Sequence, residues 1–420
     1  MNFTRVIHRL REQIHFFAQG CSALLSKPKL RFLEEMLYGI QAARDVKLSN
    51  ISRALGETIG LKKTEERLSR HLKHEDLDQQ LNEYVAGQAS GRIHRDTLLI
   101  IDPSDIRKTY ARKMPYLSLV RDGSTGEIVP GYWTCHIVAC EPKSRRMLPL
   151  HLSLWSQKAP EFDSENTQIL RAVDTVHTSV KDRGIWVMDR GGDREKLFRP
   201  FLERGLRFIV RLTAKRDLIY RGKRVHVLQL AEDCPMYFAE AIVKENRTDE
   251  KTYHLEYGFR RVRLPGREDD LYLVVVKGFG AEPLMLLTNL PMRKSRRLVW
   301  QAVEGYLCRW MVEETIRFIK QAYHLEDLRV LDYQRLKNMV ALVLMAVFFA
   351  AVKLGEELKL AVLARQVMSV AKRFFGVPDF HYYAIAEGIS TLLRYSRRGP
   401  LLVRTPPEHA IGQLLLFSPT

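Results

Sequence analysis

Hydrophobic and polar positions divide the chain into stretches with two different periods. In residues 1–90, apolar positions recur every three or four residues, as in RVIHRLREQIHFF and LRFLEEMLYGI, and no alternating stretch interrupts them. This is the spacing of amphipathic helices, so an all-helical region is expected there. Pro28 marks a helix boundary within it, because proline disfavours helical conformation in the residue that precedes it.

From residue 97, continuous apolar runs replace the helical period. The run TLLIID ends at Asp102 and the run GIWVMD ends at Asp189. Short uninterrupted apolar runs are typical of buried strands. Two further strand-like runs and a helical stretch separate these two runs, and a helix that stops at Gly205 and another strand follow them. The order β-β-β-α-β-α-β predicts an α/β fold with acids at the ends of its central strands.

The rest of the chain divides into a β-rich block and a helical end. Residues 213–283 show strand-like runs with polar turns and little helical signal, and PLMLLTNL then resumes the buried-strand pattern. From Arg296 onward the pattern is helical. The apolar run Met339–Val352 is shorter than the roughly 20 residues that cross a bilayer. It is therefore expected to be a buried core helix, with no membrane as a partner.

The composition adds a strong positive charge to this picture. Lys and Arg number 67 and Asp and Glu number 49, which gives a formal net charge of +18. Such an excess on a folded chain favours a polyanionic partner, because phosphate contacts release counterions. The five scattered cysteines argue against a disulfide framework and are typical of a reducing cytoplasm. The chain has no glycine loop that would cradle phosphates, so no nucleotide cofactor is expected.

One short segment of the helical region has the outline of a helix-turn-helix. In LSNISRALGETIGLKKTEERLSRHLKH, Gly56 and Gly60 bracket a turn and Thr64 can cap the second helix. In that motif the second helix enters the major groove of DNA. The same segment is equally compatible with an ordinary helical hairpin that has a solvated basic face. The candidate DNA contacts are the basic residues on or beside the second helix: Lys62, Lys63, Arg67, Arg70 and Lys73.

Asp102 and Asp189 are the first candidates for chemistry. A carboxylate at the carboxyl end of a buried strand lies at the rim of the sheet, where α/β folds place their sites. A strand-end aspartate is also a common turn former. Asp105 is an alternative to Asp102 if the strand ends later. Asp102 is favoured because the apolar run stops there.

A third acid belongs to a polar row in the C-terminal helical stretch. The row is formed by residues at positions i, i+3, i+7 and i+14, which lie on one helix face: Tyr306, Arg309, Glu313 and Lys320. It fits a carboxylate among phosphate-binding groups, and it also fits a solvated face with i, i+4 ion pairs. Glu314 points about 100° away from this face and is the weaker candidate.

The row and the two aspartates together resemble a known family. The spacing is similar to the Y-R-E-K signature of a large group of bacterial insertion-sequence transposases of the DDE type, as Tyr306-x2-Arg309-x3-Glu313-x6-Lys320. The segments IIDPSDI and WVMDRGGD resemble the first- and second-aspartate segments of that group. The likeness extends over about residues 97–330. One departure is Gly192, where the group normally carries a bulky residue, and it concerns local packing rather than a ligand.

The resemblance implies a catalytic triad of Asp102, Asp189 and Glu313 that holds two Mg²⁺ or Mn²⁺ ions. Carboxylate oxygens suit these hard cations, and a pair of such ions suits in-line phosphoryl displacement. The remaining residues of the signature would hold phosphate oxygens near the cut. Trp300 and Trp310 are candidates for stacking on a flipped base, although such tryptophans are more often part of a core.

The resemblance also implies a domain plan. An RNase H-like core would be formed by residues 91–212 and 284–330, with 213–283 as a β-rich insertion. A helical DNA-binding domain, 1–90, would precede the core, and a helical C-terminal region, 331–420, would follow it.

The implied activity is DNA transposition: cleavage at the ends of an element, then strand transfer, with a hairpin intermediate in similar enzymes. The implied partners are double-stranded DNA, as terminal inverted repeats and target, and a second copy of the chain on paired ends. The implied location is the bacterial cytoplasm at the nucleoid. Two other functions stay open: a metal-dependent nuclease without strand transfer, and a catalytically silent DNA-binding protein derived from a transposase.

Overall fold

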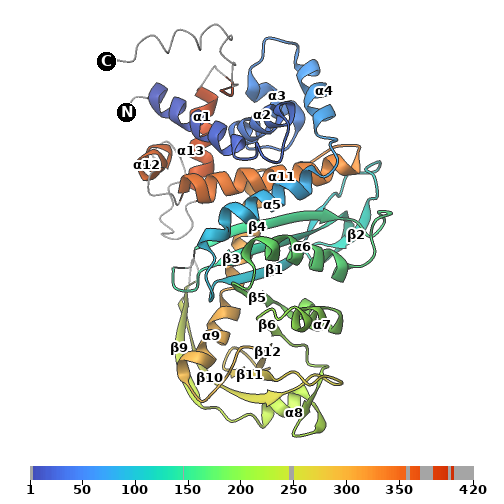
Figure 1. Ribbon diagram of the computed structural model, residues 1–420, viewed down its shortest axis with the longest axis vertical. Coiled ribbons are helices and arrows are strands. Elements are labelled where there is room, and N and C mark those ends of the chain that lie inside the picture. Colours follow the sequence, from blue (N-terminus) through green and yellow to red (C-terminus); the bar gives the residue numbers. More distant parts are fainter. Residues whose placement is uncertain are drawn as a thin grey trace, which may run out of the picture. The chain divides into compact units, whose positions relative to one another are not determined.

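The chain forms two compact units in the computed structural model, which describes residues 3–144, 146–245, 250–355, 360–368, 382–395 and 399–401. Unit 1 contains the described residues up to His74 together with those from Phe349 onward, and unit 2 is Glu75–Phe348 (Figure 1). The boundaries expected near residues 90 and 331 both fall inside unit 2. The part of the expected C-terminal region from residue 402 onward lies outside the described residues.

Unit 1 is helical and is formed by an N-terminal segment and a C-terminal segment of the chain. The hydroxyl of Ser390 and the guanidinium of Arg394 both donate to the carbonyl oxygen of Ala42, at 2.8 and 3.0 Å. These bonds satisfy a carbonyl near the end of a helix, where the backbone has no helical partner. The helices of unit 1 are α1 (Phe3–Gln19), α2 (Lys27–Ala43), α3 (Leu48–Leu55), α4 (Leu61–His71), the π-helical turn η4 (Phe349–Leu354), α12 (Ala361–Met368) and α13 (Tyr382–Tyr395).

Helices α3 and α4 form the two arms of the expected helix-turn-helix outline. Gly56 ends α3 in the left-handed conformation, with φ of 61°, and Gly60 precedes the first residue of α4. Thr64 does not cap α4 as expected. It lies one turn inside the helix and donates to Glu57 at 2.7 Å. The arm α3 approaches α2 closely at Gly39, where a Cβ atom would collide with the side chain of Ile51.

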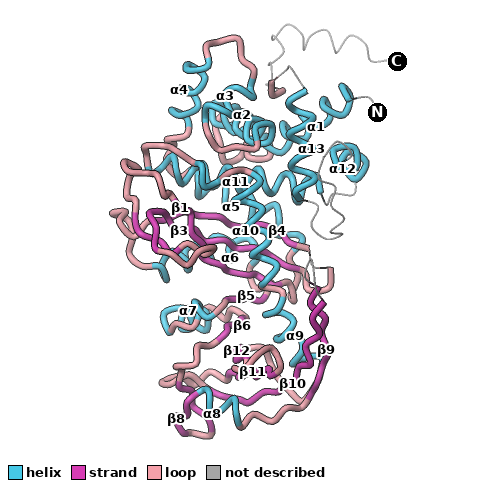
Figure 2. Tube along the Cα trace, turned by 180° about the vertical axis from the view of Figure 1, so that it is seen from behind, coloured by secondary structure: helices cyan, strands magenta, loops and turns pink. Residues whose placement is uncertain are grey.

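Unit 2 is a mixed α/β structure around one ten-stranded sheet (Figures 1 and 2). The strand order is β2-β3-β1-β5-β6-β12-β11-β10-β9, and β4 pairs with the other end of β3. β1 is parallel to β5, β5 is parallel to β6, and all other pairings in the sheet are antiparallel. The expected α/β fold is therefore confirmed. The strands are β1 (Leu98–Arg107), β2 (Ser118–Arg121), β3 (Ile128–Cys140), β4 (Met147–Trp155), β5 (Ile185–Met188), β6 (Phe208–Arg211), β9 (Phe238–Glu245), β10 (Glu250–Val262), β11 (Leu271–Lys277) and β12 (Leu284–Thr288).

Helices pack on both the antiparallel and the parallel part of this sheet. α5 and α11 contact each other and β4, α6 contacts β3 and β4, and α9 contacts β5, β6 and β11. The segment Tyr333–Leu354, which includes α11, is long and apolar enough to cross a membrane, but 89% of its most apolar window is buried, as expected of a core helix. The helices of unit 2 are α5 (Leu77–Ala89), η1 (Ser90–Arg92), α6 (Glu165–Val180), η2 (Arg190–Gly192), α7 (Glu195–Glu203), α8 (Val227–Glu232), α9 (Arg296–Leu307), α10 (Trp310–Ala322), η3 (Leu325–Asp327) and α11 (Tyr333–Phe348).

The β-rich block extends the central sheet. Its strands β9, β10 and β11 continue the order beyond β12. Among the described residues of the block, only the hairpin of β7 (Asp217–Tyr220) and β8 (Lys223–His226) forms a sheet of its own. The prediction of a strand-like segment at VLQL, residues 227–230, is wrong, because these residues begin the helix α8. Val227, Leu230 and Ala231 are buried there at helical spacing, and the helical period decides the local structure.

Candidate active site

Asp102 and Asp189 come from adjacent parallel strands. Leu98, Leu99 and Ile100 of β1 pair with Ile185, Trp186 and Val187 of β5. Each aspartate lies two residues beyond the last of these pairs, and the two therefore stand at the same level and on the same face of the sheet. Neighbouring strands are separated by about 4.8 Å, which places the two backbones close together at the carboxyl end of both strands.

The strand that carries Asp102 does not end there, contrary to expectation. β1 continues to Arg107, and Asp102 pairs with His136 of β3. The pairing with β5 stops after Ile100, so one side of β1 is open from that point. Asp102 thus lies in the middle of a strand but at the end of its parallel ladder. The apolar run in the sequence marks the end of that ladder rather than the end of the strand.

Asp189 is fixed by the turn that follows β5. Its Oδ1 atom accepts a hydrogen bond from the backbone N–H of Gly191 at 2.8 Å and so caps the short helix η2. Gly192, the departure from the family pattern, is buried against Met188. A Cβ atom at Gly192 would lie 2.6 Å from the Cβ of Met188, so this chain has no room for a bulky residue at that position.

The carboxyl of Asp102 is held in an unfavourable environment for a charge. Burial raises its pKa to about 7, and the negative charges of Asp189 and Glu313 add to the rise, while Arg309 opposes it. His136, its partner across the ladder, does not help to neutralise these acids. Complete burial lowers the pKa of His136 to about 3, so the ring is uncharged at neutral pH.

Arg309 connects the first and third acids. Its guanidinium contacts Oδ1 of Asp102 at 3.4 Å and Oε1 of Glu313 at 3.1 Å. The arginine side chain is only 10% exposed, and its buried Nε has no hydrogen-bond partner among the described residues. A buried donor without a partner is unfavourable, so this atom is available to a ligand that enters the site.

The spacing predicts that the four residues of the polar row lie on one uninterrupted helix, but the structure divides them between two. Tyr306 belongs to α9, Arg309 precedes α10, and Glu313 and Lys320 belong to α10. At the junction the N–H of Arg309 bonds to Tyr306 three residues back, in a single tight turn with helical dihedral angles. The chain therefore keeps its direction, and the i, i+4 contact from Arg309 to Glu313 survives the break.

Tyr306 lies beneath Arg309. The guanidinium carbon of Arg309 is 5.9 Å from the centre of its ring. Tyr306 is almost fully buried, and its hydroxyl has no hydrogen-bond partner within the described part of the chain. The phenol and the guanidinium thus present two unsatisfied donors at one place in the site.

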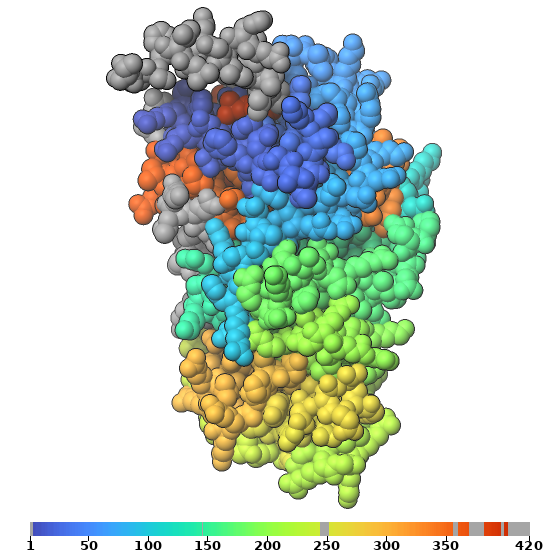
Figure 3. Space-filling view, in the orientation of Figure 1, coloured from blue at the N-terminus to red at the C-terminus, as the bar shows by residue number. Residues whose placement is uncertain are grey.

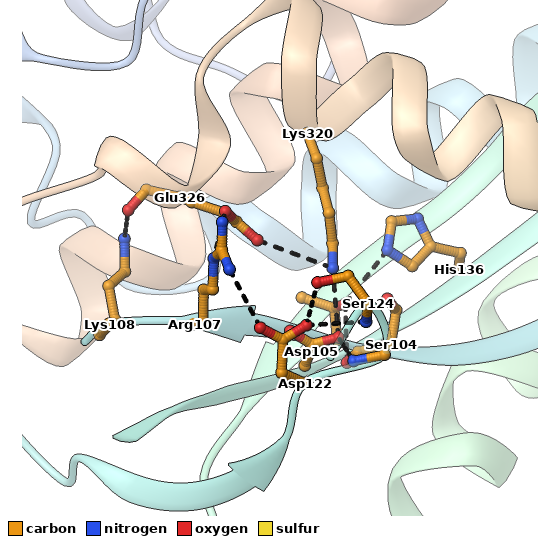
Figure 4. A network of polar contacts seen from close by, with 11 residues as sticks. Ser104, Asp105, Arg107, Lys108, Asp122, Ser124, His136, Lys320 and Glu326 are labelled. Atoms are coloured by element: carbon orange, nitrogen blue, oxygen red, sulfur yellow. Dashed lines mark hydrogen bonds and ion pairs between the residues drawn. The ribbon is translucent and has the colours of Figure 1, made fainter. Parts of the chain in front are cut away.

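Lys320 contacts a different carboxylate from the one that contacts Arg309. Its Nζ lies 3.2 Å from Oδ1 of Asp105 and 3.9 Å from Oε1 of Glu326, and Figure 4 shows it pointing between these two side chains. Asp105 also accepts from the N–H of Gly123 at 3.2 Å. Asp105, the alternative first ligand, is thus held by a lysine and a backbone donor.

A second set of ion pairs lies beside Lys320. Arg107 contacts Asp122 and Glu326, each at 3.1 Å. Lys108 is buried and donates to the carbonyl oxygen of Glu326 (Figure 4). It also donates to the carbonyl oxygen of Leu328. No periodic pattern along the chain indicates this network, because its members come from the far end of β1, the turn after β2 and the segment η3.

The two candidate stacking residues pack against other aromatic rings. The ring of Trp300 lies 5.4 Å from Tyr257, and that of Trp310 lies 6.0 Å from Phe279 in an edge-to-face arrangement. Both tryptophans are half-buried. Each therefore joins the α9–α10 segment to the β-rich block.

The basic residues of α4 differ in their surroundings. Arg67 forms ion pairs with Glu35 and, at 2.7 Å, with Glu57, and its side chain is only 25% exposed. It therefore links α4 to α2 and to the turn before α4. The other candidates are exposed on the surface of unit 1: Lys62, Lys63, Arg70 and Lys73.

Comparison with known families identifies the domain that contains these residues. The family model of the transposase DDE domain matches residues 93–349, which is more than half of the chain. The chain belongs to this family. It is a DNA transposase, an enzyme that cleaves DNA and transfers strands by phosphoryl transfer.

The chain was also compared with solved structures and with curated proteins. Among solved structures, the transposase is similar to a piggyBac transposase in a synaptic complex with hairpin DNA, at 10% identity and a TM-score of 0.45, covering 98% of this chain and 83% of that chain. A search of the curated proteins finds no match.

DDE transposases use divalent metal ions. Among the described residues, no three His, Cys, Asp or Glu side chains lie close enough to share an ion. The donor set nevertheless fits one. Two aspartates share a level of the sheet, Glu313 shares Arg309 with Asp102, and all three offer the hard oxygen atoms that Mg²⁺ and Mn²⁺ prefer. The side chain of Glu313 is 54% exposed.

Proposed function

We propose that this transposase acts through Asp102, Asp189 and Glu313 as its metal-binding catalytic triad. The observation that supports this most is the shared level of the two aspartates on parallel strands, with Arg309 joining Asp102 to Glu313. The raised pKa of Asp102 supports it too, since the nearby acids repel one another without a cation. We further infer an RNase H-like core, because β4, β3 and β1 are antiparallel while β1, β5 and β6 are parallel.

The residues of this site have separate roles in the proposed chemistry. Two bound Mg²⁺ or Mn²⁺ ions would supply activation of the attacking oxygen and stabilisation of the leaving oxygen. The two aspartates fix the position of the cut, because Asp102 belongs to β1 and Asp189 caps the turn that directly follows β5. Arg309 balances the charge of the acids in the absence of DNA and turns its unpaired Nε to a phosphate oxygen when DNA is bound. The buried hydroxyl of Tyr306 donates to a second phosphate oxygen.

Two successive displacements account for cleavage and strand transfer. Water attacks the phosphodiester at the element end and releases a 3′-hydroxyl. That hydroxyl then attacks another phosphodiester, either on the opposite strand, which gives a hairpin, or in the target. We assign the protein on these grounds to the bacterial insertion-sequence group with the Y-R-E-K signature, acting on terminal inverted repeats as a homodimer at the nucleoid.

A plasmid assay tests this assignment. Supercoiled plasmid that carries a pair of element ends is incubated with the full chain and Mg²⁺, and nicked, hairpin and joined products are separated on denaturing gels. Excised element and joined products are expected, and they disappear together in Asp189→Asn. Nicking without any joined product would favour a nuclease, and DNA binding without cleavage would favour a silent binding protein.

We also propose that α4 contacts the element ends. Its exposed cations support this, and Arg67 serves as an internal ion-pair partner. The double variant Lys62→Gln/Lys63→Gln is expected to weaken end-DNA binding in gel shifts and to reduce its salt dependence, because two phosphate contacts are lost. Arg204→Gln, which removes a cation directly after the end of α7, is the control. Equal binding by both variants would remove α4 from the DNA interface.

A further inference from the structure

The β-rich block contains a pocket that the proposed chemistry does not use. It lies between the β7–β8 hairpin, β10 and the segment that precedes β9, and it encloses about 800 Å³. Arginines and aromatic rings dominate its lining: Tyr220, Arg221, Tyr237, Phe259, Arg260 and Arg261. A volume of this size is typical of sites for small organic groups.

Two of the pocket's arginines form no ion pair among the described residues, although Asp233 also lines the pocket. Within the described part of the chain, Arg221 and Arg260 form no ion pair; Arg260 donates instead to the hydroxyl of Tyr220 at 2.7 Å and to the carbonyl of Asp233. The Nε of Arg260 is buried without a hydrogen-bond partner among the same residues. The neighbouring arginines differ, since Arg261 and Arg263 both contact Asp270. The pocket thus combines free guanidinium charge with an unsatisfied donor.

The same two arginines stack on one tyrosine. The guanidinium carbons of Arg260 and Arg221 lie 4.9 and 5.2 Å from the centre of the Tyr220 ring. Tyr237 also lines the pocket, and its ring faces the Nζ of Lys294 at 4.6 Å. Planar guanidinium groups and aromatic rings are the surfaces on which unpaired bases stack.

Arg221 is placed at the pocket against its backbone preference. β7 and β8 are joined by a two-residue turn, Arg221–Gly222, with φ of 50° and 75°. Such turns favour Asn-Gly, because both central residues need positive φ. An arginine in this conformation conflicts with local propensity, and conflicts of this kind gather at functional positions.

The pocket lies at a distance from the catalytic acids that DNA can bridge. β10 is four strands away from β5 in the sheet, which corresponds to about 19 Å or about five to six base steps. Figure 1 shows α8 and β10, and Figure 2 shows β8, at the end of unit 2 remote from β1 and β4. Figure 3 shows the surface of this block in yellow-green and yellow.

We propose that this pocket binds an unpaired nucleotide of the DNA strand that the transposase processes. Arg221 and Arg260 bind the phosphodiester, and the base packs against their planar guanidinium groups over Tyr220 and beside Tyr237. The inference rests on the proposed function for its ligand, since it takes the strand to be the one cut at the triad. A single strand is favoured over a duplex because the aromatic rings lie within the pocket, where only a base outside a stack can reach them.

Binding of a labelled oligothymidylate of 12 nucleotides to the full chain, measured by fluorescence anisotropy without divalent metal, tests the charge. Arg221→Asn keeps a residue that the turn favours and removes the guanidinium. We expect it to weaken binding about tenfold and to reduce the slope of log affinity against log salt by about 0.7. Arg221→Lys should stay within about threefold of the wild type, and Arg224→Gln, which removes an exposed cation outside the pocket, within about twofold.

Photocrosslinking tests the base contact. An oligonucleotide with 5-iodouracil should crosslink to Tyr220 or Tyr237, located by mass spectrometry of the digested protein. Equal weakening by Arg221→Asn and Arg224→Gln, absence of crosslinks to both tyrosines, or tighter pocket crosslinking of duplex would overturn the proposal. Displacement of the oligonucleotide by equimolar thymidine monophosphate or inorganic phosphate would also overturn it, in favour of a free-nucleotide or anion site. Because neither assay requires catalysis, a chain that binds but does not cleave would refute the catalytic proposal alone.

Discussion

Asp102 and Asp105 lie three residues apart on the same strand, and each contacts a cation from the α9–α10 segment. Asp102 shares Arg309 with Glu313, lies at the level of Asp189, and has a raised pKa. Asp105 is more deeply buried and has its own lysine and a backbone donor. The first aspartate thus belongs to a group with excess negative charge, and the second forms an ion pair with Lys320 through Oδ1, while its Oδ2 is buried without a hydrogen-bond partner among the described residues.

This difference shows what distinguishes a metal ligand from a structural acid on one strand. The two residues are of the same type and belong to the same strand, so their surroundings decide the difference. An excess of carboxylates is stable only when a cation joins it, whereas a paired carboxylate needs no ligand. Substitution of the two aspartates should therefore have different effects.

The largest expected effect separates the two aspartates directly. Asp102→Asn should reduce end cleavage by about a thousandfold or more, since residues of a catalytic unit fail together. Its folded state should remain at least as stable, because one repelling charge is removed. Asp105→Asn should instead lower the free energy of unfolding by about 3 kcal/mol, because Lys320 loses its buried partner. Cleavage assays beside urea unfolding check both, and a reversed pattern would make Asp105 the ligand.

The third acid can be tested with its neighbour as control. Glu313→Gln should abolish cleavage to a similar degree as Asp102→Asn while gel-shift binding to end DNA persists. Glu314 contacts only Arg317 at the surface, so Glu314→Gln should change cleavage by less than about threefold. Comparable activity in the two variants would exclude Glu313 from the triad.

A double-mutant cycle sharpens the role of Lys320. If its contact with Asp105 is structural, Asp105→Asn/Lys320→Met should recover about half or more of the stability that Asp105→Asn loses, since no unpaired charge stays buried. Cleavage should nevertheless stay about tenfold or more below the wild type if the lysine also binds a phosphate when DNA is present. Full recovery of cleavage would restrict Lys320 to the structural pair.

The smallest expected effect is a thermal shift. Mn²⁺ at millimolar concentration, without DNA, should raise the melting temperature of the wild type by a few degrees through preferential binding to the folded state, roughly 1 kcal/mol at modest saturation. Asp102→Asn should abolish the shift, and Glu314→Gln should retain it. An equal shift in Asp102→Asn would place the ion at other carboxylates.

Several elements were predictable because their signals are local. The run LLIID and the run IWVMD form buried strands, and the apolar run at 339–352 lies in a buried helix. The tight turn at Cys308 and Arg309 was not predictable, because its dihedral angles remain helical and no proline or glycine marks it. The helix α8 was also missed, since its four apolar letters fit a strand as well as a helix.

The sequence by itself determined the order of the elements, the excess of positive charge and the three acids that the family resemblance selects, because these depend on period and spacing along the chain. Only the tertiary structure decided which cation meets which acid. Arg309 and Lys320 are 11 residues apart on one segment, and the level at which that segment crosses β1 assigns one to Asp102 and the other to Asp105. Likewise, the arginine pocket forms from the β7–β8 hairpin and β10 only when the β-rich block folds onto the edge of the sheet. Its charged and aromatic residues are scattered over residues 219–270 and follow no common period in the sequence.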